Sequence, residues 1–83
     1  MCAIYLADDN LLEEESLEAL LVLAREHGFR LVDLDSEDTV NTYGGEPQVL
    51  PLIYLERKQR HEQAVIFKNG NGKFVVRRYD LPM

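Results

Sequence analysis

The tetrapeptide Asn69-Gly70-Asn71-Gly72 places the tightest constraint on how this chain of 83 residues can fold. Asparagine and glycine tolerate the positive φ angles that tight hairpin turns require. Runs rich in apolar residues flank the tetrapeptide, over residues 64–68 and 73–79. The sequence therefore predicts an antiparallel hairpin built from these two runs.

An amphipathic helix is predicted over residues 11–27. Four small or apolar residues recur at the i, i+3, i+4, i+7 spacing of one buried stripe: Leu17, Leu20, Leu21 and Ala24. Asn10 stands where a helix cap is expected, and Glu13 follows three residues later as in a capping box. Gly28 is well placed to end the helix, because glycine readily adopts the left-handed conformation just past a C-cap.

Three further apolar runs predict strands, over residues 2–7, 29–34 and 49–55. The helix joins the first two strands into a βαβ unit, whose crossover should be right-handed. Residues 36–47 are polar and are expected to be irregular. The predicted fold class is α+β, in a single small domain over residues 1–83. It has an N-terminal βαβ unit, then a three-stranded antiparallel meander, with one long helix packed on one face of a sheet of about five strands.

The strand at 49–55 is apolar on both faces, because Val49, Ile53 and Leu55 alternate with Leu50, Leu52 and Tyr54. One helix covers only one face of a sheet. We therefore expect the second face to be covered by the loop at 36–47, by a second copy of the chain or by another protein, since large apolar patches are rarely left exposed. Pro51 predicts an edge or a bulge in this strand.

Composition narrows the class of protein. A hydrophobic content of 46% is that of a folded globule. Cys2 is the only cysteine, so an intrachain disulfide and a multi-cysteine zinc site are excluded. A small domain without disulfides fits a reducing, cytoplasmic setting. No apolar stretch approaches 18 residues, and we expect neither a membrane span nor a signal peptide.

Charge is distributed unevenly along the chain. Residues 1–46 hold twelve acidic and two basic residues, whereas residues 47–83 hold three acidic and seven basic ones. The halves carry net charges of −10 and +4, which together give the −6 of the whole chain. This asymmetry suggests a charged partner or self-association.

The segment Ile4-Tyr5-Leu6-Ala7-Asp8-Asp9-Asn10 resembles the start of a two-component receiver domain, over about residues 3–35. The resemblance implies an acidic pair after the first strand that binds Mg²⁺, beside a phosphorylated aspartate on the third strand. No aspartate ends the run at 49–55, and the family's lysine has no counterpart here. A degenerate, receiver-like Mg²⁺-binding domain is one alternative, and solvated acids near a helix start are the simpler interpretation.

Catalysis is not expected. The sequence shows no set of nucleophile, base and oxyanion donors, and His27 and His61 stand alone without companions at metal-ligand spacing. We therefore predict no catalytic residue, no metal site and no cofactor.

The leading hypothesis is a small non-catalytic interaction or regulatory protein: an inhibitor, adaptor or accessory subunit. It would dock on a protein partner through its acidic helix surface or an uncovered apolar sheet face, and a homodimer is compatible with this. The candidate partner-binding residues are Glu14, Glu15, Glu18, Asp35, Glu37, Asp38, Tyr54, Arg57, Lys58 and Arg60. The alternative is a nucleic-acid-binding module that uses the basic, aromatic-rich C-terminal hairpin, although a pI near 4.7 disfavours it.

Overall fold

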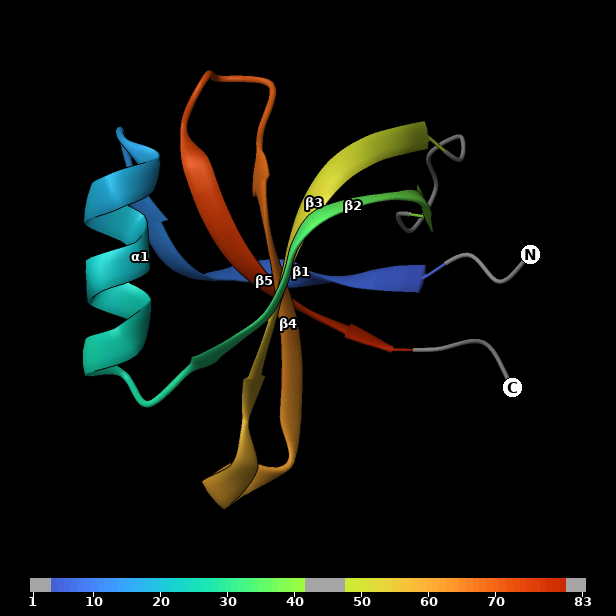
Figure 1. Ribbon diagram of the computed structural model, residues 1–83. Coiled ribbons are helices and arrows are strands. Elements are labelled where there is room, and N and C mark those ends of the chain that lie inside the picture. Colours follow the sequence, from blue (N-terminus) through green and yellow to red (C-terminus); the bar gives the residue numbers. More distant parts are fainter. Residues whose placement is uncertain (1–3, 42–47, 81–83) are drawn as a thin grey trace.

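Five strands curl into a closed barrel in the order β1-β2-β3-β4-β5 (Figure 1). The computed structural model describes residues 4–41 and 48–80. The elements are β1 (Ile4–Glu14), α1 (Leu17–Glu26), β2 (Arg30–Asn41), β3 (Gln48–Arg57), the 3-10 turn η1 (Lys58–Arg60), β4 (Glu62–Lys68) and β5 (Phe74–Asp80). Neighbouring strands pair antiparallel, except for a short parallel contact between β1 and β2 at one end of the barrel.

The predicted hairpin is confirmed. β4 and β5 pair antiparallel, and Ile66 lies opposite Val76. The side-chain oxygen of Asn69 accepts hydrogen bonds from the backbone N–H groups of Asn71 and Lys73, both at 3.0 Å. Gly72 has a φ of +83°, a conformation that costs glycine little and other residues more.

The predicted fold class is wrong, because the described residues form a closed five-stranded barrel with one short helix. Residues 11–14, expected in a long helix, instead continue β1, and Leu12 and Glu13 lie opposite Val76 and Val75 of β5. The backbone of β5 therefore supplies hydrogen-bond partners that outweigh the local helix signal of this segment. The strand-helix-strand order remains, but it is part of a barrel.

The helix begins later than predicted. Ser16 is its N-cap, and the Ser16 hydroxyl accepts a hydrogen bond from the backbone N–H of Ala19 at 3.1 Å. Asn10 lies in β1, where its side-chain oxygen accepts a hydrogen bond from the Nε–H of Arg77 at 2.6 Å. The predicted end is correct, because Gly28 follows the last turn with a φ of +86°.

β2 is twice as long as predicted. Residues 36–41, expected to be irregular, continue the strand and pair with β3 as far as Val40 opposite Gln48. The remainder of the predicted loop, residues 42–47, lies outside the described residues. The β2–β3 register shifts between Leu31 and Asp33 and again between Asp33 and Ser36, and such bulges increase the local twist.

The two faces of β3 contribute to different core clusters. One core cluster contains Ile4, Leu6, Val40, Leu52, Val65, Phe67 and Val75. The other contains Leu20, Ala24, Phe29, Leu55, Ala64, Ile66 and Val76. Leu52 and Leu55 of β3 thus belong to different clusters. Residues 36–41 of the loop expected over the second face are a strand paired with β3, and Leu20 and Ala24 of α1 pack in the same cluster as Leu55.

Candidate functional site

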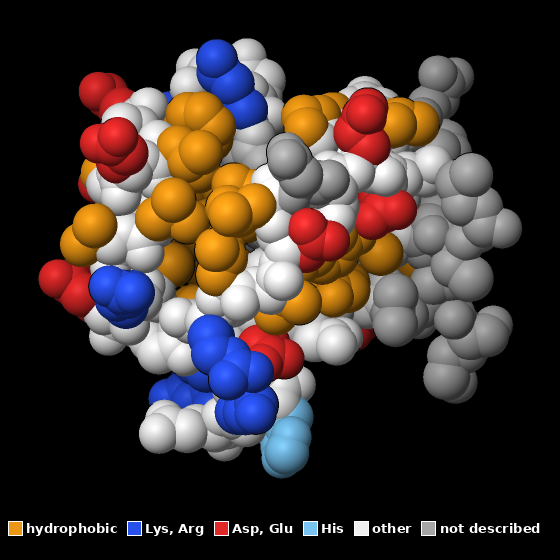
Figure 2. Space-filling view, viewed as in Figure 1, with side chains coloured by type: hydrophobic (Ala, Val, Ile, Leu, Met, Phe, Trp, Pro, Cys, Tyr) orange, Lys and Arg blue, Asp and Glu red, His pale blue; other side chains and the backbone are white. Residues whose placement is uncertain are grey.

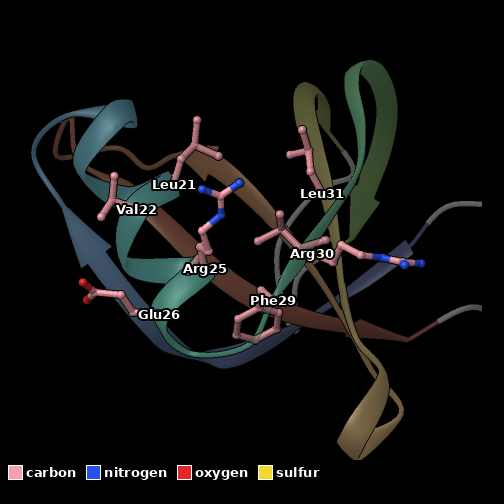
Figure 3. A pocket seen from close by; sticks show the side chains of 9 residues that line it. Leu21, Val22, Arg25, Glu26, Phe29, Arg30 and Leu31 are labelled. Carbon is pink, nitrogen blue, oxygen red and sulfur yellow. The ribbon is translucent and has the colours of Figure 1, made fainter.

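An apolar groove lies between α1 and the start of β2 (Figure 3). Leu21 and Val22 of α1 form one wall, and Leu31 of β2 forms the other. Phe29 and Leu55 lie at its base, and the volume of the hollow is about 650 Å³. Arg25 reaches toward the gap, whereas Glu26 and Arg30 point away from it.

A second apolar hollow of about 290 Å³ is lined by other residues of the same three elements, α1, β2 and β3, and by residues of β4 and β5. Leu17, which is one helical turn before Leu21, lines it on the helix side. Leu34, which follows Leu31 by three residues on β2, lines it on the strand side. Ile53 of β3 lies between these walls. We call the combined surface the α1–β2 groove. It is formed by Leu17, Leu21, Val22, Phe29, Leu31, Leu34, Ile53 and Leu55.

The position of α1 explains why the groove exists. The helix packs mainly on β1 and β5. A helix is about 10 Å wide and strands lie about 4.8 Å apart, so one helix covers about two strands. Phe29 and Leu55 are buried in one cluster with Leu20 and Ala24 of α1, whereas Leu31 and Leu34 of β2 are left exposed beside the helix.

Exposed apolar side chains concentrate at this groove. Among the described residues, six large hydrophobic side chains are exposed. Four of them lie on α1 or the first half of β2: Val22 (60%), Leu31 (45%), Val32 (57%) and Leu34 (56%). Hydrophobic side chains gather between α1 and β2 in the space-filling view (Figure 2). A contiguous apolar patch of this kind is typical of an interaction surface.

Charged residues of both signs lie near the groove. The charged residues that line the two hollows are Arg25, Arg30, Lys68 and Glu26, and Arg30 is ion-paired with Glu56. Exposed carboxylates lie elsewhere on the same elements: Glu18 on α1, and Asp33 and Glu37 on β2. The lining itself is therefore basic on balance.

The predicted acidic residues do not form one surface. Glu14 is half-buried at the end of β1, and Glu15 and Glu18 are exposed around the start of α1. Glu37 and Asp38 belong to β2, so the acidic loop expected there is a strand. The side chain of Asp35 lies outside the described residues. None of those with a described side chain lines either hollow.

Tyr54 and Asp38 are engaged with each other. The Tyr54 hydroxyl donates a hydrogen bond to the Asp38 carboxylate, and the Tyr54 ring packs edge-on against Tyr79 with centroids 5.5 Å apart. Burial, and then the hydrogen bond to Asp38, raise the pKa of Tyr54 above its ordinary value. Both residues thus serve the packing of the barrel.

Arg57 is a structural residue, whereas Lys58 and Arg60 are exposed in η1. The Arg57 guanidinium lies 4.4 Å from the centroid of the Phe29 ring and is ion-paired with Glu62 at 2.6 Å. These contacts leave its side chain only 15% exposed.

Three of the four bases of the hairpin make contacts within the barrel, and Arg78 is exposed. Arg77 donates to Asn10 and lies 5.6 Å from the Phe67 ring centroid, and the Lys73 ammonium is 3.5 Å from a carboxylate oxygen of Glu13. Lys68 lies over Phe74 at 5.9 Å. Lys68, Lys73 and Arg77 thus contact side chains of the barrel itself, and the nucleic-acid alternative stays a prediction.

No metal centre is found in the described part of the chain, where no group of three or more His, Cys, Asp or Glu side chains converges. No helix in the described part of the chain is long and apolar enough to cross a membrane. Comparisons with protein-family models, curated proteins and solved structures found no match.

Proposed function

We propose that this protein is a non-catalytic interaction protein, which docks an apolar segment of a partner protein in the α1–β2 groove. The observation that carries the proposal is the exposure of three large apolar side chains that line these hollows, Val22, Leu31 and Leu34, on a barrel whose two core clusters are buried. Filling the groove would remove Val22, Leu31 and Leu34 from water, and burial of apolar area is the main favourable term in association.

The exposed acids of α1 suit a partner with basic residues beside its apolar segment. Glu18 and Glu26 would speed encounter with positive charge. Reversing charge in a Glu18→Lys, Glu26→Lys variant is expected to slow association and reduce its salt dependence. Stopped-flow or surface-plasmon-resonance association rates across a range of salt concentrations measure this, and unchanged rates would remove the acids from the proposal.

The test is a quantitative capture experiment with matched variants. Tagged wild-type protein and a Val22→Glu, Leu31→Glu variant are incubated with nuclease-treated lysate of the source cells, and bound proteins are quantified by mass spectrometry. A Val49→Glu variant is the control, because Val49 is 64% exposed but lines neither hollow.

The proposal expects a stoichiometric protein that is lost with the groove variant and retained with the Val49 control. Circular dichroism of each variant excludes unfolding as the cause. Capture that is the same for all three proteins, or that disappears with nuclease for wild type, would contradict docking in the groove.

A further inference from the structure

We infer that the segment docked in the α1–β2 groove is an extended apolar segment of another protein, which pairs as an added strand with the free edge of β2. The inference rests on the proposed function and adds the conformation of the partner segment and the way it bonds to the barrel. Three observations carry it: the pairing of β2, the exposure of its first residues and the position of the groove beside them.

The barrel closes between β1 and β2 at one end only. Among the described residues, these two strands pair where Ile4 lies opposite Val40 and Tyr5 lies opposite Asn41. The rest of β2, over residues 30–39, pairs with β3 on one side. The other side of this part of β2 is therefore a sheet edge, and a sheet edge offers its outward N–H and C=O groups to a further strand.

The exposure of β2 agrees with a free edge. All five residues from Arg30 to Leu34 are exposed, although a strand with a neighbour on each side and a core beneath it buries about every second residue. Three of the five are large and apolar: Leu31, Val32 and Leu34. An exposed apolar edge of this kind is a template for pairing with another chain.

The groove lies beside this edge. Leu31 lines the larger hollow and Leu34 lines the smaller one, and α1 packs mainly on β1 and β5. Leu21 and Val22 of α1 stand across the gap from Leu31 (Figure 3). A strand added about 4.8 Å from β2 would lie in this gap, where its apolar side chains would contact both walls.

An extended segment uses both features of this surface. Its backbone would bond to the edge of β2 and its alternate side chains would contact the apolar walls, as when a peptide adds a strand to an exposed sheet edge. A docked helix has its backbone hydrogen bonds satisfied internally, so it would use the side chains alone. The register shifts of β2 lie in its ladder with β3 and increase the local twist, so we expect the added strand to be short.

The charges of β2 disfavour a second copy at this edge. The strand holds one base and four acidic residues: Asp33, Asp35, Glu37 and Asp38. Antiparallel pairing of two such edges about a two-fold axis would bring these acids together, and like charges at facing positions destabilise a strand pair. A segment of another protein is therefore the better match.

The test uses designed peptides of one composition, built from leucine and glutamine with a lysine at each end. In the first, leucine and glutamine alternate strictly, which favours a strand, and in the second the same residues are ordered with helical period. A third is the alternating peptide with N-methyl groups on two successive central residues, which block hydrogen bonding on both of its edges. A fourth carries the two N-methyl groups at its ends, as the control for methylation. Fluorescence anisotropy of the labelled peptides measures their affinity for the folded protein.

The alternating peptide is expected to bind at least tenfold more tightly than the helical-period and the centrally methylated peptides, and methylation at the ends should change the affinity little. Amide hydrogen exchange, followed by NMR, should slow at the first residues of β2 on binding, because an added strand takes up outward N–H groups of the edge.

A Leu31→Lys variant should weaken binding of the alternating peptide about tenfold, because it removes an apolar contact and because lysines protect strand edges from pairing. Val49→Lys is the matched control and should leave the affinity unchanged, since Val49 is exposed but lines neither hollow. Circular dichroism shows whether each variant is folded, and the comparison of peptides needs the wild-type protein alone.

The outcomes separate this inference from the proposed function. Equal binding of the centrally methylated peptide, tighter binding of the helical-period peptide, or unchanged exchange in β2 would overturn strand addition and leave groove docking intact. Failure of every peptide to bind would also overturn the inference, while the capture experiment with groove variants decides the proposed function independently. A dimer in analytical ultracentrifugation that Leu31→Lys dissociates would show that a second copy occupies the edge, and would overturn the inference as well.

Discussion

The guanidinium of Arg57 joins three parts of the barrel. It lies over the Phe29 ring, forms an ion pair with Glu62 and donates a hydrogen bond to the backbone carbonyl of His27 at 3.1 Å. The start of β2, the end of α1 and the β3–β4 turn thus converge on one side chain. Because both partners of the ion pair are only 15% exposed, water does little to screen it.

Replacing Arg57 with alanine is expected to lower the free energy of unfolding by about 2–4 kcal/mol, because Glu62 would be left partly buried without its partner. Urea denaturation followed by circular dichroism measures the change. Arg30→Ala is the control, because the Arg30 side chain is 65% exposed and its ion pair with Glu56 should contribute less than about 1 kcal/mol. Equal losses in the two variants would contradict the structural role assigned to Arg57.

Tyr54 makes the stability of the barrel sensitive to alkaline pH. Its pKa is raised above the ordinary value of 10.0 by burial and by the hydrogen bond to Asp38. Below pH 10 the hydroxyl is protonated in both the folded and unfolded states, and its contribution is fully present. Above pH 10 the unfolded state releases the proton and the folded state keeps it, so the free energy of unfolding should fall as pH rises.

Urea midpoints measured between pH 8 and pH 11 test this effect. The wild-type midpoint is expected to fall above pH 10, and Tyr54→Phe should reduce the fall because it removes the titrating group. Burial also raises the pKa of Tyr79, so Tyr79 will supply part of the pH dependence that remains in Tyr54→Phe. A midpoint whose pH dependence is the same in wild type and Tyr54→Phe would show that Tyr54 does not contribute.

At the scale of elements, the cap of α1 is Ser16. Ser16→Ala removes the acceptor for the Ala19 N–H and is expected to destabilise the protein by about 1 kcal/mol. Ser16→Asp keeps a good capping side chain and should be nearly neutral. Thermal or urea unfolding of both variants measures the difference, and equal stabilities would place the helix start elsewhere.

Sequence patterns predicted the elements whose signals are local. The Asn-Gly turn predicted the β4–β5 hairpin, and Gly28 predicted the end of α1. Pro51 predicted an edge, and it lies just outside the β3–β4 ladder, which begins at Ile53. Two boundaries were wrong, at residues 11–14 and 36–41. Both segments are strands because β5 and β3 pair with them, and such long-range partners leave no local signal.

At the scale of the whole molecule, the candidate site could not be predicted from the sequence. The apolar run at 29–34 has the pattern of a buried strand, and only the position of α1 over β1 and β5 leaves Leu31 and Leu34 uncovered. The basic half of the chain was not a reliable guide, because Arg57 and Arg77 serve internal contacts.

An exposed apolar groove on a folded protein should bind a hydrophobic dye. We expect the native protein to enhance 8-anilinonaphthalene-1-sulfonate fluorescence, because the groove offers apolar walls of the size of a small ligand. Leu31→Ser should reduce the enhancement, and Val49→Ser should not. Equal dye fluorescence in both variants would place the apolar surface elsewhere.

Pairing of β1 with β5 also determines when the barrel can close during synthesis. About 60 residues separate the end of β1 from the start of β5. At about 5–20 residues per second, β1 waits roughly 3–12 s for that partner strand. Throughout this interval the nascent chain presents an unpaired strand, and Asp9, Glu13 and Glu14 place charges along it that discourage pairing with neighbouring chains.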